Sequence, residues 1–158
     1  MASNVWINDL MRCFKRFLGV YSIDTVKRPL VYPSYTIVNF SNSREAGTHF
    51  VAILFYTPAV CLYFDPLNLS FIPVGIFDYM TENSISVYRV NFKIQNDSSI
   101  FCAFYCLIPI FLHMNDIPIS EGLSLFQKNR LSNDKKCITL LKVLIKKYFQ
   151  TISTMQDN

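Results

Sequence analysis

The chain has 158 residues, enough for one domain with a single hydrophobic core. Half of its residues (51%) are hydrophobic and only 16% are charged, which excludes a disordered chain and suggests that some apolar surface needs a partner. The net charge of +4 is a mild basic excess, which favours a polyanionic partner only weakly.

The first half of the chain predicts one helix followed by strands. Hydrophobic residues recur three and four positions apart over Asn4–Leu18, which indicates an amphipathic helix, and Gly19 is expected to end it. The segment Phe50–Phe55 is hydrophobic on both faces, so we expect a central strand that is covered on both sides. Segments rich in β-branched and aromatic residues predict five strands: Tyr35–Phe40, His49–Tyr56, Val60–Asp65, Leu69–Pro73 and Ile85–Lys93.

A second helix is expected to begin within a residue or two of Cys102. The polar segment Asn96–Ser99 offers capping oxygens just before an apolar run over residues 100–114. Pro109 is expected to kink or shorten this helix. The apolar run is too short to cross a bilayer, so we interpret it as a buried core helix and predict no membrane partner.

The C-terminal part predicts one more helix, over Asp134–Phe149, followed by a polar, frayed tail. Lysines lie on or near the polar face of this helix and are interpreted first as a solvated surface. Without an internal repeat or a linker, the sequence predicts a single domain over residues 1–150 and a tail over residues 151–158.

The five cysteines are odd in number, and their spacings form no disulfide framework. No hydrophobic leader opens the chain, so we expect free thiols and an intracellular, reducing location. Cys102, Cys106 and His113 fall near one helix face, but no fourth ligand is evident. Phosphate-binding and dinucleotide-binding motifs are absent from the sequence, and we therefore expect neither a metal nor a cofactor.

Cys102 is the candidate nucleophile. The first turn of a helix presents unpaired N–H groups and the positive end of the helix dipole. A cysteine in that position is shifted toward the reactive thiolate, and a neighbouring histidine shifts it further. The alternative interpretation is a small buried hydrophobic residue in an apolar helix.

His49 and Asp65 are the candidate base and its orienting acid. If Thr57–Ala59 forms a three-residue hairpin turn, then Val51 faces Asp65, and His49 becomes its diagonal neighbour on the same face. A carboxylate there would hold one tautomer of the imidazole and favour the imidazolium. A register shift of one residue would place the two side chains on opposite faces, with no contact. Gln95, seven residues before Cys102, could donate to a developing oxyanion or be an ordinary loop residue.

The order His49, Asp65, Gln95, Cys102 resembles that of the adenovirus maturation protease (adenain) family, which includes relatives in large DNA transposons and small DNA viruses. The seven-residue step from Gln95 to Cys102 favours adenain over the related SUMO proteases, whose step is typically six. The matching segments are Phe17–Tyr21, Ile37–Asn39, Arg44–Ala52, Cys61–Pro66, Gln95–Cys106 and Phe111–His113.

The resemblance implies an α+β, papain-like fold with a mixed central sheet and the nucleophile on a helix packed against it. It implies that Cys102 attacks the scissile carbonyl, that His49 takes its proton and that Asp65, in place of a frequent Glu, orients His49. Gln95 and the N–H of Cys102 would hold the oxyanion. The implied activity is endopeptidase processing of viral or transposon-encoded precursor proteins, in the host nucleus or cytoplasm and in the virion.

The sequence also departs from the family pattern. Phe50 replaces a Trp, and Ala103 replaces the Gly that follows the nucleophile. The segment Ile85–Lys93 contains no cysteine for a disulfide to a peptide activator, and DNA activation would depend on the lysines of the last helix. Two alternatives remain, namely a SUMO- or ubiquitin-like-protein protease and a catalytically dead module that serves as an interaction domain.

Overall fold

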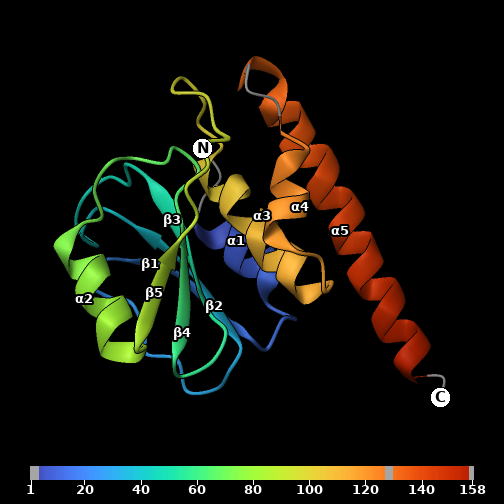
Figure 1. The fold of residues 1–158 in the computed structure, drawn as a ribbon, viewed down its shortest axis with the longest axis horizontal. Coiled ribbons are helices and arrows are strands. Elements are labelled where there is room, and N and C mark those ends of the chain that lie inside the picture. The colour runs from blue at the N-terminus through green and yellow to red at the C-terminus, as the bar shows by residue number, and fades with distance from the viewer. Residues whose placement is uncertain (1–3, 127–129, 157–158) are drawn as a thin grey trace.

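The computed structural model describes residues 4–126 and 130–156, which fold into one mixed sheet flanked by helices (Figure 1). The sheet follows chain order, with β1/β2 and β4/β5 parallel and the pairs between them antiparallel. The strands are β1 (Phe17–Ser22), β2 (Ser34–Asn39), β3 (Phe50–Phe55), β4 (Val60–Phe64) and β5 (Ser86–Arg89). The predicted α+β class with a mixed central sheet is confirmed.

Helices cover both faces of this sheet. In Figure 1, α2 lies on one face, whereas α1 and α3 lie on the other, with α4 and α5 outside α3. None of the described helices is long and apolar enough to cross a lipid bilayer. The helices are α1 (Asn4–Met11), α2 (Val74–Asn83), α3 (Cys102–Met114), α4 (Ile119–Ser124) and α5 (Asn133–Gln156), with a 3-10 turn at Arg130–Ser132.

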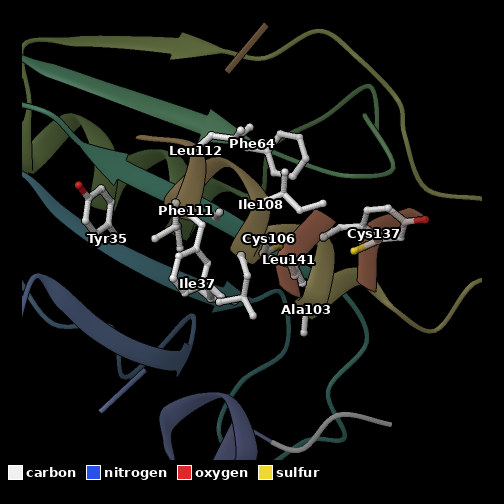
Figure 2. Close-up of a cluster of buried hydrophobic side chains, with 14 of the residues drawn as sticks. Tyr35, Ile37, Phe64, Ala103, Cys106, Ile108, Phe111, Leu112, Cys137 and Leu141 are labelled. Carbon is white, nitrogen blue, oxygen red and sulfur yellow. The ribbon is translucent and has the colours of Figure 1, made fainter. Parts of the chain in front are cut away.

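The larger core lies between the sheet and α3. Figure 2 shows Ile37 of β2 beside Phe111 of α3, Phe64 of β4 beside Leu112 of α3, and Leu141 of α5 beside Cys106 of α3. The smaller core lies between the opposite face and α2. Every residue of β3 is buried, because alternate side chains enter the two cores. The expectation of a central strand covered on both sides is therefore confirmed.

Helix α3 begins at Cys102, as predicted, and packs against β3. Its N-cap is Phe101 rather than one of the predicted polar residues, and no side chain caps it. Instead, the hydroxyl of Ser99 accepts a hydrogen bond from the Phe101 N–H at 3.1 Å. Pro109 lies inside the helix and does not end it.

The predicted helix over Asn4–Leu18 was wrong in its second half. The helix ends at Met11, and Phe17–Ser22 forms the edge strand β1, paired with β2. Gly19 lies within this strand at φ +138°, where a side chain is strained and a Cβ would lie 2.9 Å from the ring of Tyr21. Pairing with β2 selects a strand in spite of the helical periodicity, and this long-range pairing could not be predicted from the local sequence.

Three further predictions need correction. Residues 69–73, expected to form a strand, have no regular structure, and α2 follows them unpredicted. The strand expected over Ile85–Lys93 is limited to Ser86–Arg89, and α4 was also missed. The last helix continues to Gln156, so most of the tail predicted over residues 151–158 is helical, and residues 157 and 158 lie outside the described part.

Candidate active site

The four predicted site residues come from four separate places in the fold. His49 directly precedes β3, Asp65 directly follows β4, Gln95 lies between β5 and α3, and Cys102 is the first residue of α3. A small cavity of about 180 Å³ is lined by His49, Gln95 and Cys102, together with residues of the neighbouring segments Gly47–Thr48 and Ser99–Ile100. The fold therefore brings the predicted nucleophile, base and amide to one cavity.

His49 and Asp65 meet because of the register of the β3–β4 hairpin. Ala52 pairs with Phe64, and the Tyr56 N–H bonds the Val60 carbonyl around the predicted three-residue turn. That register puts His49 and Asp65 on one face, and His49 Nε2 lies 2.7 Å from Asp65 Oδ1. The contact predicted from counting turn residues is present in the structure.

Asp65 is fully buried and is held by the backbone as well as by His49. Its Oδ1 accepts a hydrogen bond from the Leu67 N–H at 2.9 Å, and its Oδ2 accepts one from the Leu69 N–H at 2.9 Å. Burial raises the pKa of the Asp65 carboxyl, but His49 and these two N–H groups outweigh it and lower the pKa below its usual value. Asp65 is thus a fixed, ionised partner for the imidazole.

The ring of His49 is favoured in its charged form. Burial lowers the pKa of His49, but the hydrogen bond and charge of Asp65, together with the adjacent Cys102 side chain, raise the pKa to about 9. Phe40 packs edge-on against the imidazole, with ring centroids 5.0 Å apart at 88°. The ring is therefore oriented on one side by a carboxylate and on another by an aromatic wall.

Cys102 differs from the other four cysteines in its surroundings. All five thiols are free, and Cys102 is partly exposed beside His49. Cys61, Cys106 and Cys137 are buried, and burial raises the pKa of each of these three thiols. Cys13 is exposed. The N–H of Cys102 belongs to the first helical turn, where the helix offers no acceptor.

Gln95 is almost fully buried and lines the cavity, and a hydrogen bond constrains its amide. Its Nε2 donates a hydrogen bond to the Ser99 carbonyl at 2.8 Å, which leaves the second N–H of that nitrogen for another acceptor. Its Oε1 has no partner among the described residues. A buried carbonyl without a partner is costly for stability.

Asn39, which was not predicted to have a role, supports the segment before His49. Its Oδ1 accepts hydrogen bonds from the Ser41 N–H at 2.8 Å and the Thr48 N–H at 3.3 Å. A Cβ on Gly47 would lie 2.4 Å from Asn39 Nδ2, so any larger residue at position 47 would force the Asn39 side chain to shift. The only sequence signal was the position of Asn39 within a segment that resembles the adenain family.

Cys106 and His113, considered with Cys102 as metal ligands, have other partners. The thiol of Cys106 donates to the Phe50 carbonyl at 3.2 Å. His113 Nδ1 lies 2.8 Å from the Tyr35 hydroxyl, and its ring stacks on Tyr56 with centroids 4.5 Å apart. Over residues 4–126 and 130–156, no three His, Cys, Asp or Glu side chains form a group that could hold a metal ion.

The comparisons with known proteins give likenesses among solved structures but no match in sequence. No protein-family model matches the chain, and the search of curated proteins found no matching sequence. Among solved structures, the fold is similar to that of the ASFV pS273R protease, with a TM-score of 0.45 and 18% sequence identity. The match covers 71% of this chain and 45% of that one, so this chain spans less than half of that protease. Function is therefore inferred from this chain's own geometry.

Proposed function

We propose that this chain is a cysteine endopeptidase with Cys102 as nucleophile, His49 as base, Asp65 as orienting acid and Gln95 as an oxyanion donor. The observation that carries the proposal is the buried 2.7 Å contact between His49 and Asp65, on a ring that also meets a thiol at a helix N-terminus. A thiolate–imidazolium pair needs this combination, because each charge stabilises the other in a site with little water.

In the proposed acylation step, the Cys102 thiolate bonds to the scissile carbonyl carbon, and the carbonyl electrons move to its oxygen. The free N–H of Gln95 and the N–H of Cys102 donate to that oxyanion. As the oxyanion collapses, the C–N bond breaks and the His49 imidazolium gives its proton to the leaving amine. His49 then takes a proton from water, whose oxygen displaces sulfur and releases the acid product.

The substrate class that we propose is a viral or transposon-encoded precursor protein, cleaved in an adenain-like manner. The resemblance of the segments around all four site residues supports this choice over a SUMO- or ubiquitin-like-protein protease. A nuclear, cytoplasmic or virion location follows from that proposal alone. A peptide activator bound by a disulfide is not favoured, since β5 contains no cysteine, and DNA activation would depend on the lysines of α5.

The direct test compares cleavage of a panel of precursor-derived peptides by the wild type, Cys102→Ala and Cys13→Ala. Cys13 is a matched control because it is an exposed free thiol with no role in the proposed site. We expect the wild type and Cys13→Ala to cleave the same peptides and Cys102→Ala to cleave none. Equal cleavage by the wild type and Cys102→Ala would exclude the proposed nucleophile.

The same proteins distinguish the alternatives. Fusions of SUMO or ubiquitin to a reporter test the alternative of a SUMO- or ubiquitin-like-protein protease. Cleavage of these fusions instead of the precursor peptides would replace the proposed substrate class. A thiol-reactive peptide probe tests the alternative of a catalytically dead interaction domain, because in such a domain Cys102 would be no more reactive than Cys13. We expect selective labelling of Cys102.

A further inference from the structure

Ser99 connects the two groups that the proposed function assigns to the oxyanion. Its carbonyl oxygen accepts a hydrogen bond from Gln95 Nε2 at 2.8 Å. Its hydroxyl oxygen accepts one from the Phe101 N–H at 3.1 Å, and Phe101 is the N-cap directly before Cys102. One residue thus fixes both the rotation of the Gln95 amide and the start of the nucleophile helix.

Asp134, 35 residues further along the chain, holds Ser99 in place. The Ser99 hydroxyl donates to Asp134 Oδ1 at 2.7 Å, and the Tyr105 hydroxyl donates to the same oxygen at 2.8 Å. Asp134 belongs to the first turn of α5, whereas Tyr105 belongs to α3. One carboxylate oxygen therefore joins α5 to α3 and to the Gln95–Phe101 segment.

Neighbours of Asp134 hold the same segment on the other side of Gln95. The fully buried Asn133 donates from Nδ2 to the carbonyl of Ile94, the residue before Gln95, at 2.8 Å. Arg130 donates from Nε to the Lys93 carbonyl at 3.2 Å. The start of α5 therefore contacts the Gln95 segment both before and after the amide.

From these contacts we propose that Ser99 and Asp134 are positioning residues that align the oxyanion donors Gln95 and Cys102 N–H. This inference rests on the proposed function. A side-chain amide rotates about single bonds, and an oxyanion donor works only at a fixed position about 3 Å from the developing charge. The Ser99 carbonyl uses one of the two N–H groups of Gln95 and so directs the other. The bond to a carboxylate is charge-assisted, and it fixes the rotamer of Ser99.

The inference is tested by comparing a reaction that forms an oxyanion with one that does not. Peptide cleavage forms an oxyanion. In alkylation by iodoacetamide, the Cys102 sulfur bonds to the CH2 carbon and iodide leaves, so no charge develops on an oxygen. In Asp134→Ala and Ser99→Ala, we expect kcat for cleavage to fall about tenfold or more, with KM little changed. We expect the alkylation rate of Cys102 to stay within about twofold of the wild type, because His49 and Asp65 are untouched.

Conservative and matched variants separate positioning from general destabilisation. Asp134→Asn and Ser99→Thr keep the acceptor and the hydroxyl, and we expect each to recover most of the lost kcat. Thr36→Val removes a buried hydrogen bond from the Thr36 hydroxyl of β2 to the Gly19 carbonyl of β1, away from the Ser99 network. We expect this variant to lose stability without changing the ratio of cleavage to alkylation.

Two results would overturn the inference while the wild type remains active. In the first, the rates of cleavage and of Cys102 alkylation fall by the same factor in Asp134→Ala or Ser99→Ala. In the second, neither rate falls in these variants. If Asp134→Ala fails to fold, Ser99→Ala gives the same test. A wild type that neither cleaves peptides nor alkylates faster at Cys102 than at Cys13 would instead overturn the proposed function itself.

Discussion

Asp65→Asn is the substitution that tests the His49–Asp65 pair most sharply. The asparagine oxygen can keep the position of Oδ1, where His49 and the Leu67 N–H bind. The new NH2 group then faces the Leu69 N–H, which loses its acceptor. We therefore expect a folded protein that loses about 1–3 kcal/mol of unfolding free energy from the orphaned donor.

The effect on reactivity follows from the charge. A rise in the pKa of His49 from 6.5 to about 9 corresponds to roughly 3 kcal/mol of preference for the imidazolium. Asp65 and the Cys102 side chain supply this preference together and against the opposing effect of burial, and we expect loss of the Asp65 charge to lower the population of the ion pair about thirtyfold, or by about 2 kcal/mol. Without that charge, the proton moves back from the imidazolium to the Cys102 sulfur.

The assay is the second-order rate of iodoacetamide alkylation at Cys102 near neutral pH, followed by mass spectrometry. We expect Asp65→Asn to be alkylated about thirtyfold more slowly than the wild type. Asp78→Asn, the same chemical change at an exposed position of α2, serves as control and should react like the wild type. An Asp65→Asn rate within twofold of the wild type would refute the role assigned to the carboxylate.

Three further outcomes are expected. The lowered pKa of Asp65 stabilises the fold above about pH 3.8, and the raised pKa of His49 stabilises it below about pH 6.5, with loss as pH rises toward 9. The difference in unfolding free energy between the wild type and Asp65→Asn should therefore be largest between these two pH values and shrink toward pH 9. Urea titrations that give the same difference at pH 5 and at pH 9 would contradict this prediction. Gln95→Leu should lower kcat about 10²–10³-fold, with the unfolding free energy changed by no more than about 1 kcal/mol, because the lost bond to Ser99 is offset by removal of a carbonyl without a partner. Asn39→Ala should lower the melting temperature and the alkylation rate of Cys102 together, since it releases the Thr48 N–H beside His49; an unchanged alkylation rate would exclude a positioning role for Asn39.

The central contact could be predicted from the sequence because it depends on short-range counting. A three-residue turn fixes the register of the β3–β4 hairpin, and the register decides which side chains share a face. Cys102 was predicted at a helix start for a similar local reason, because a polar segment gives way to an apolar run. These features are set by residues close together in the chain.

Features that depend on distant residues could not be predicted in this way. The helical periodicity before Gly19 continues into a segment that pairs with β2, and only that pairing selects a strand. The contact between Ser99 and Asp134 requires α5 to pack on α3, which no local pattern specifies. Asn39 was likewise missed, since its role depends on a loop that folds back over it.

The most direct test of the central claim compares the alkylation rates of Cys102 and Cys13 in the same wild-type molecule and in His49→Ala. Cys13 reports the reactivity of an exposed thiol without a histidine partner. We predict that Cys102 reacts much faster than Cys13 in the wild type, although Cys102 is less exposed, and that this advantage disappears in His49→Ala. Equal rates at the two thiols in the wild type, or an advantage of Cys102 that survives the loss of His49, would contradict the account.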